Sequence, residues 1–176
     1  MHLKIVAMLV SILVIFTSQF TQADAYRLGP GDVIRIDVYD EADLSFQRLL
    51  IGSKGLISFP FVGDIRVSGQ TVASIERTLV RGLKPDYLVN PRITVSVLEY
   101  RPFFINGEVA SPGGIAYSPG LTLRKAISLA GGFTERASRT NISVIAEQDL
   151  GDKSKKIGMD YKVSPGDVIT VEQSFF

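Results

Sequence analysis

The sequence contains no cysteine and no tryptophan, and its one histidine is His2. Without cysteine the chain forms no disulfide bond, so its stability has to come from buried apolar surface or from partner subunits. A lipid anchor attached through cysteine is excluded for the same reason. A His/Cys metal site and a histidine-based catalytic triad are also excluded for the residues that follow the N-terminal segment. These absences remove the commonest classes of enzyme.

An excess of charge of one sign is also lacking. The chain has 19 Lys and Arg against 18 Asp and Glu, a formal net charge of +1. A nucleic-acid-binding protein would show a basic patch or stripe, so no nucleic-acid partner is expected. Lys153, Lys155 and Lys156 form the only basic cluster, and they lie in a polar segment. We expect this segment to be the solvated tip of a hairpin.

Long apolar runs are absent except near the N-terminus. Lys4 precedes the apolar run Ile5 to Phe16, and Ala23-Asp24-Ala25 follows a short polar stretch. A basic start, a short apolar run and an A-x-A site predict a secretory signal peptide over residues 1–25, cleaved before Tyr26. The alternative, a membrane anchor, would need roughly 20 apolar residues. The sequence therefore predicts a protein exported from the cytoplasm.

The segment 26–100 reads as a first small lobe. Gly29-Pro30-Gly31-Asp32 suits a type II turn, and residues 33–39 alternate as a half-buried strand does. Two short apolar runs, Leu49 to Ile51 and Leu56 to Phe59, flank Gly52 to Gly55 and predict a hairpin. Thr71 is the expected N-cap of a helix stopped by Gly82 and Pro85, and a regular strand covers 92–98.

The segment 101–176 reads as a second lobe that begins at Arg101-Pro102. A strand is expected at Phe103 to Ile105 and a short helix after Thr122, closed by Gly131-Gly132. Further strands are expected at 141–146, 157–161 and 168–171. Strands mixed with two short helices predict an α+β fold in which antiparallel hairpins predominate.

One short sequence occurs twice. Pro-Gly-Asp-Val-Ile stands at residues 30–34 and again at 165–169. Common ancestry of the two lobes and convergence on a turn that launches a strand both explain the repeat, since Pro-Gly is the favoured type II pair. In both copies we expect the aspartate, Asp32 or Asp167, to bond back to its own turn.

Candidate catalytic groups are few. Asp40, Glu41 and Asp43 could in principle form the carboxylate pair of a glycosidase, but one short loop holds all three, and a solvated acidic turn is favoured. Glu108 is an isolated carboxylate. The glycine pairs 113–114 and 131–132 match neither a P-loop nor a dinucleotide fingerprint. The aromatic residues Phe103, Phe104 and Tyr117 are expected in the core or at an interface, with a sugar platform as the open alternative.

The ordered series of turns and strands resembles the periplasmic and outer-membrane polysaccharide export proteins of Gram-negative bacteria. Tyr26 to Val33, Gly55 to Pro60, Gly63-Asp64-Ile65 and Gly69-Gln70-Thr71 resemble the export domain of that family. Asn106 to Val109 with Pro112-Gly113, and Leu121 to Phe133, resemble a β-grasp-like SLBB domain. The residues that carry the resemblance are Gly29, Pro30, Gly31, Asp32, Pro60, Gly63, Gly69, Gly107, Glu108, Pro112, Gly113, Ala130, Gly131, Gly132, Pro165, Gly166 and Asp167.

The resemblance implies a signal peptide (1–25), an export domain (26–100) and an SLBB domain (101–176). It also implies a non-enzymatic conduit for capsule or exopolysaccharide, built as a homo-oligomeric ring of about eight subunits, with no cofactor. The expected location is the periplasm, in association with the outer membrane, and the expected partners are the polysaccharide and an inner-membrane co-polymerase. Because the sequence shows one SLBB-like module and no apolar helix before Phe176, a separate outer-membrane β-barrel is expected as a further partner.

Two other hypotheses remain open on sequence grounds. The second lobe could make the protein a soluble oligosaccharide-binding module. The acidic loop at Asp40 and Glu41 could make it a polysaccharide-modifying enzyme, which the substitutions Asp40→Asn and Glu41→Gln would test.

Overall fold

The computed structural model describes residues 26–147 and 153–174. The predicted signal peptide lies outside the described residues, as does part of the polar segment that leads to Lys153. Within the described ranges the architecture is α+β, as predicted. Neither helix there has the length and apolar character that crossing a membrane requires.

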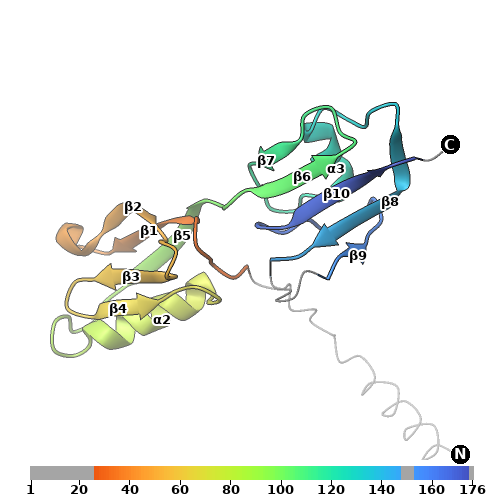
Figure 1. Ribbon diagram of the computed structural model, residues 1–176. Helices are drawn as coiled ribbons and strands as arrows, with labels where there is room; N and C mark the ends of the chain where they lie inside the picture. The colour runs from red at the N-terminus through yellow and green to blue at the C-terminus, as the bar shows by residue number, and fades with distance from the viewer. Residues whose placement is uncertain (1–25, 148–152, 175–176) are drawn as a thin grey trace, which may run out of the picture.

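Two separate hydrophobic clusters organise these elements. One contains buried residues between Leu28 and Val95, and the other contains buried residues between Phe103 and Val171. We call each cluster with its surrounding elements a lobe, and Figure 1 shows the two lobes joined by the chain between β5 and β6.

The first lobe has a three-stranded sheet, a two-stranded sheet and one long helix. The three-stranded sheet has the order β2-β1-β5, formed by Phe46–Leu50, Val33–Val38 and Ile93–Glu99, and all its pairs are antiparallel. The second sheet pairs β3 (Leu56–Phe59) with β4 (Gly63–Arg66). A short 3-10 helix, η1 (Ala42–Leu44), follows β1, and α2 (Val72–Leu83) packs against β5.

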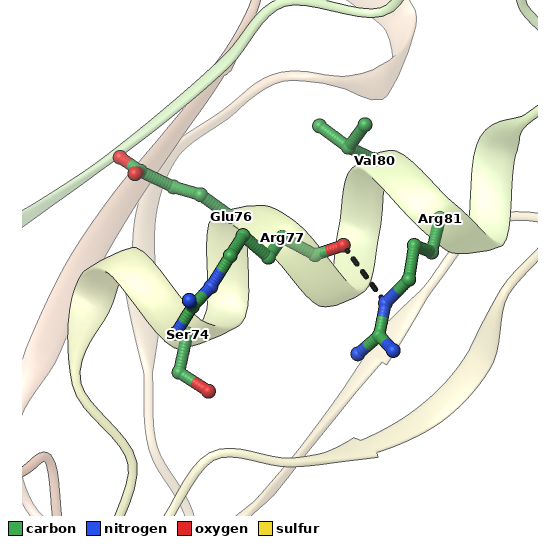
Figure 2. A pocket seen from close by; sticks show the side chains of 5 residues that line it. All are labelled: Ser74, Glu76, Arg77, Val80 and Arg81. Atoms are coloured by element: carbon green, nitrogen blue, oxygen red, sulfur yellow. Dashed lines mark hydrogen bonds between the residues drawn. The ribbon is translucent and has the colours of Figure 1, made fainter.

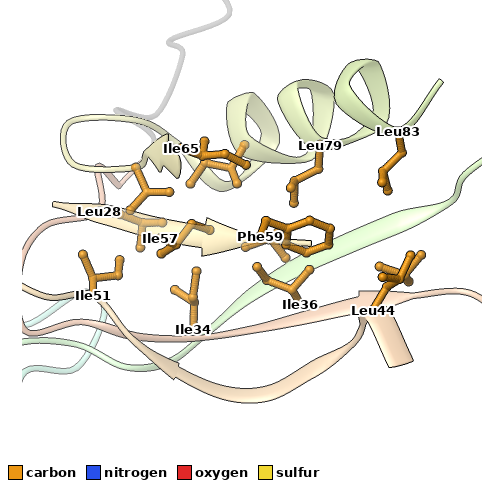
Figure 3. Packing of buried hydrophobic residues seen from close by; sticks show 14 residues of the cluster. Leu28, Ile34, Ile36, Leu44, Ile51, Ile57, Phe59, Ile65, Leu79 and Leu83 are labelled. Atoms are coloured by element: carbon orange, nitrogen blue, oxygen red, sulfur yellow. The ribbon is translucent and has the colours of Figure 1, made fainter. Parts of the chain in front are cut away.

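The first core lies between these layers. Figure 3 shows Ile34 and Ile36 of β1 pointing toward β3, while Leu79 and Leu83 of α2 point in from the other side. These four residues are fully buried. The alternation predicted for the first strand and the helix predicted after Thr71 are therefore confirmed. The Thr71 side chain accepts a hydrogen bond from the Ser74 N–H at 3.3 Å, as an N-cap does.

Two local predictions for this lobe are wrong. The Gly52–Gly55 turn forms, with Gly55 N–H donating to the Gly52 carbonyl at 2.9 Å, but it does not make a hairpin. The strand before the turn pairs with β1 and the strand after it pairs with β4, so the turn passes the chain between two sheets. Gly82 lies inside α2 rather than ending it; a Cβ there would lie 2.7 Å from a methyl group of Val62. Close packing explains this glycine.

The second lobe is a five-stranded sheet with one helix. The sheet order is β7-β6-β10-β8-β9, formed by Gly113–Ile115, Phe103–Gly107, Val168–Gln173, Ala137–Ile145 and Lys155–Lys156. The central strand β10 is parallel to β6 and antiparallel to β8. The returning strand predicted at 157–161 is displaced to β9, after which Ile157 N–H still donates to the Ile142 carbonyl at 2.9 Å.

The helix α3 (Leu123–Leu129) covers the second core as its spacing predicts. Leu123, Ala126, Ile127 and Ala130 are all buried. The helix ends in a Schellman motif, in which Gly132 N–H donates to the Ile127 carbonyl and Gly131 N–H donates to the Ser128 carbonyl. Thr122 occupies the N-cap position, but its side chain makes no capping hydrogen bond.

Candidate functional site

The repeat extends beyond Pro-Gly-Asp-Val-Ile to nine residues in each lobe. Tyr26–Ile34 reads YRLGPGDVI and Tyr161–Ile169 reads YKVSPGDVI. In both copies the third turn residue is a glycine with positive φ, +92° at Gly31 and +84° at Gly166. In each copy the aspartate N–H donates a hydrogen bond of 3.2 Å to the carbonyl oxygen of the first turn residue, Gly29 or Ser164. These hydrogen bonds confirm the two predicted turns.

Each repeat buries its aspartate. Oδ2 of Asp32 accepts hydrogen bonds from the Gly29 N–H at 2.8 Å and the Tyr26 hydroxyl at 2.6 Å. Oδ2 of Asp167 accepts from the Ser164 N–H at 2.8 Å and the Tyr161 hydroxyl at 2.9 Å. Asp32 and Asp167 are the two buried charged residues of the described chain, 0% and 1% exposed. The backbone bonds were predicted, whereas the tyrosine six residues before each aspartate was missed.

Only the first repeat holds an arginine among the described contacts. The Arg101 N–H donates to Oδ1 of Asp32 at 2.8 Å, and Arg101 Nη1 donates to Oδ2 of Asp32 at 3.0 Å and to the Tyr26 hydroxyl at 2.6 Å. Arg101 Nε donates to Glu147 at 2.6 Å. We call Tyr26, Asp32, Arg101 and Glu147 the junction cluster. It ties the first turn of one lobe to the loop after β8 in the other.

Glycine makes room for this cluster. A Cβ at Gly29 would lie 2.7 Å from Arg101 Nη1, so a larger residue there would displace the guanidinium. Backbone bonds hold the second repeat against the same joint, since the Gly166 N–H donates to the Pro102 carbonyl at 3.0 Å. Both repeats therefore meet at Arg101-Pro102.

Burial and hydrogen bonds together shift the pKa values of Tyr26, Arg101 and Asp167. Burial raises the pKa of Asp167, although the hydrogen bonds from Ser164 and Tyr161 oppose the shift. Burial, with the hydrogen bond to Asp32, raises the pKa of Tyr26. Burial works against the charge of Arg101, but its hydrogen bond to Glu147 and the nearby Tyr26 and Asp32 leave the pKa of Arg101 raised. Arg101 thus stays a cation across the ordinary pH range.

Two further tyrosines, Tyr100 and Tyr117, extend the junction cluster by edge-on ring contacts. The rings of Tyr26 and Tyr100 lie 4.9 Å apart, and those of Tyr100 and Tyr117 lie 5.3 Å apart. Tyr117 was predicted for the core or an interface, and it lies half-buried beside the joint. Phe103 is fully buried, while Phe104 is 44% exposed.

The remaining predicted residues lie apart from the junction cluster. Glu108 is not isolated, because the Thr134 hydroxyl donates to its carboxylate. Gly107 has φ +84°, and a Cβ there would overlap the Val171 carbonyl oxygen. Ala130, Gly131 and Gly132 form the end of α3. The other residues that carry the family resemblance lie in turns or next to strand ends; they are Pro60, Gly63, Gly69, Pro112 and Gly113.

The acidic loop, Asp40 to Asp43, follows β1 in the first lobe. Asp40 and Glu41 line an open groove of about 400 Å³, and Asp43 is exposed outside it. Across residues 26–147 and 153–174, no three carboxylate, histidine or cysteine side chains gather closely enough to hold a metal ion.

A larger groove of about 560 Å³ runs along α2. Figure 2 shows its five lining residues, Ser74, Glu76, Arg77, Val80 and Arg81, all on this helix. Arg81 Nε donates to the Arg77 carbonyl at 3.4 Å, and Glu76 accepts a hydrogen bond from the Val95 N–H of β5 at 2.8 Å. Glu76 thereby occupies an outward-facing N–H of an edge strand. A ligand pocket needs polar groups that converge from several directions, and these five residues come from one helix.

Two family models match successive parts of the chain. Residues 21–98 match the family model "polysaccharide biosynthesis/export protein", and residues 102–158 match the SLBB domain model. The chain belongs to the polysaccharide biosynthesis/export protein family. Between the two matched segments lie residues 99–101, which include Arg101.

Named relatives agree with this assignment. The chain is 34% identical over 129 residues to the exopolysaccharide production protein ExoF of Rhizobium meliloti, an alignment that covers 66% of this chain and 30% of ExoF. It is 30% identical over 186 residues to the EPS I polysaccharide export outer membrane protein EpsA of Ralstonia nicotianae, with 86% of this chain and 48% of EpsA covered. The chain thus spans less than half the length of these relatives.

Proposed function

We propose that this protein is a non-enzymatic component of a machine that exports exopolysaccharide or capsule. In this proposal residues 26–100 form an export domain and residues 101–176 an SLBB domain, and the protein forms or caps an oligomeric conduit. It acts in the periplasm or at the outer membrane after its signal peptide is removed. The co-polymerase and the separate outer-membrane β-barrel stay predictions from the resemblance.

The observation that carries the proposal is the order of the two matched modules with Arg101 at their joint. A closed ring requires every subunit to repeat the same angle to its neighbour. If the two modules of one subunit could rotate freely, a ring built from both would not close reproducibly. The contacts of Arg101 with Asp32 and Glu147 tie the modules together. Such a joint suits a subunit that contributes both modules to one ring.

Deletion of the gene in the producing organism tests the proposal. We expect secreted polymer to fall strongly, with polymer or its lipid-linked precursors retained in the cell, and the unaltered gene to restore secretion. Secretion that continues at the wild-type rate after gene deletion would contradict the proposal. The oligomeric conduit is tested separately by measuring the mass of the protein in membranes or detergent extracts, where a monomer under all conditions would contradict it.

A further inference from the structure

One turn of the chain carries a residue that does not suit its backbone. Phe59-Pro60-Phe61-Val62 has proline in the second position, and the Val62 N–H donates to the Phe59 carbonyl at 3.2 Å. Its third residue, Phe61, has φ +64°. A bulky side chain in this left-handed region is a conformational outlier.

Comparable turns elsewhere in the chain have glycine in the third position. Three other turns also have proline in the second position and a hydrogen bond from the fourth residue to the first, and their third residues are Gly31, Gly120 and Gly166. Glycine adopts positive φ without steric cost. A phenylalanine in the fourth turn therefore strains the backbone, and its side chain needs another explanation.

Burial in the core does not explain the phenylalanine at position 61. It is 62% exposed and stacks on Tyr87, itself 49% exposed, with ring centroids 4.5 Å apart and planes 25° from parallel. Phe61 lies in the β3–β4 turn, and Tyr87 lies in the connection from α2 to β5. Figure 1 shows both connections at the end of the first lobe away from the second lobe. We call Phe61 and Tyr87 the tip stack.

We propose that the tip stack binds a pyranose ring of the exported polymer, an inference that rests on the proposed function above. The face of a pyranose carries C–H groups, and the face of an aromatic ring is electron-rich, so the two attract each other and exclude water. Hydroxyl groups at the sugar rim need polar partners, and the same connection carries two exposed polar residues, Asp86 directly before Tyr87 and Asn90 three residues after it.

The size of the tip stack favours a sugar over a protein. Two aromatic side chains offer at most about 500 Å². A stable protein partner covers roughly 800 Å² on each side of its interface. Two stacked rings instead match the dimensions of one or two sugar units.

Substitutions in the full chain test this inference. Phe61→Gly removes the ring and places glycine where the turn favours it, so this variant should fold and melt close to the unaltered chain, because relief of the positive-φ strain offsets the lost ring contact. Tyr87→Leu removes the other ring without touching the strained position. Phe104→Leu is the matched control, because Phe104 is an exposed phenylalanine of the other lobe.

The probe is a set of oligosaccharides made by partial acid hydrolysis of the polymer that the producing strain secretes. Ligand-observed NMR measures their dissociation constants with each protein. We expect binding to the unaltered chain, about tenfold weaker binding to Phe61→Gly and Tyr87→Leu, and unchanged binding to Phe104→Leu.

Two results would overturn the inference: no binding by the unaltered chain, or equal binding by Phe61→Gly. A Phe61→Gly variant that changes the native mass but not sugar binding would also overturn it, since the tip stack would then be a contact between proteins. Gene deletion separates this inference from the proposed function. If deletion abolishes secretion while Phe61→Gly binds the oligosaccharides normally, the export function stands and the sugar site does not.

Discussion

Arg101 donates hydrogen bonds to both carboxylate oxygens of Asp32. Its backbone N–H bonds Oδ1 at 2.8 Å, and its guanidinium bonds Oδ2 at 3.0 Å. The aspartate belongs to the first turn of one lobe, and the arginine begins the other. A carboxylate with no exposure to water is costly unless it is fully hydrogen-bonded, and here the arginine supplies two of its bonds. The joint between the lobes is therefore also a condition for the stability of the first turn.

The first prediction concerns this pair. Arg101→Met should lower the free energy of unfolding by about 3 kcal/mol, because it leaves the buried Asp32 carboxylate without its cation. Chemical denaturation measures the loss. Arg48→Met is the control, since Arg48 pairs with Glu99 at 2.6 Å but both side chains are more than half exposed. We expect no measurable change for the control, and similar losses for the two variants would contradict the prediction.

The second prediction concerns pH. Burial raises the pKa of Asp167 in the folded chain above the value of about 3.9 for an unfolded aspartate. The stability associated with the protonated form is fully present below the unfolded pKa and is lost as the pH rises through the folded pKa. Asp167→Asn cannot ionise, and its amide oxygen can still accept from Ser164 and Tyr161.

The stability of Asp167→Asn relative to the unaltered chain should therefore increase between pH 3.5 and pH 7. The measurement is the difference in the free energy of unfolding between the two proteins at each pH. A difference that is flat, or that decreases with rising pH, would show that burial does not govern this carboxyl group.

The third prediction separates backbone strain from a steric clash. Gly107→Ala combines positive φ with a Cβ that overlaps the Val171 carbonyl oxygen, so β6 and β10 must move apart. Gly120→Ala has φ +78° and no atom within 4 Å of its added Cβ. We expect a loss of about 1–2 kcal/mol for Gly120→Ala and a clearly larger loss for Gly107→Ala in thermal unfolding. Equal losses would mean that the strands adjust freely.

The fourth prediction compares two threonines at helix starts. The Thr71 side chain accepts a hydrogen bond from Ser74, whereas the Thr122 side chain makes no capping bond. Thr71→Ala should cost about 1 kcal/mol, and Thr122→Ala should cost a small fraction of that. Urea unfolding of both variants tests the difference, and the reverse order would contradict it.

Local patterns in the sequence predicted much of the fold because they depend on neighbouring residues. The alternation at Ile34, Ile36 and Val38, the helical spacing after Thr71 and the glycine end of α3 all depend on contacts within a few positions. Strand pairing does not depend on such local contacts alone. The strand before Gly52 has β1 on one side and β3 on the other at similar short separations in the sequence, so no local pattern distinguishes the two possible partners.

The candidate site was predictable in part for the same reason. The aspartates of the two repeats bond to their own turns, and the sequence predicts those bonds from turn chemistry alone. Arg101 meets Asp32 across 69 residues of sequence and meets Glu147 across 46, and only the packing of the two lobes determines these contacts. The tyrosine at the same place in both repeats was the one available signal, and a comparison over nine residues rather than five would have found it.

The position of β10 in its sheet governs how the second lobe folds. This strand lies between β6 and β8, although it comes after both in the chain. Until residues 168–173 join the sheet, no strand connects β6 with β8. The first lobe has all its strands by Glu99, so its sheets do not depend on residues 168–173. We therefore expect β10 to be the strand whose arrival completes the second lobe, so that removal of residues 168–173 would unfold this lobe and leave the sheets of the first intact.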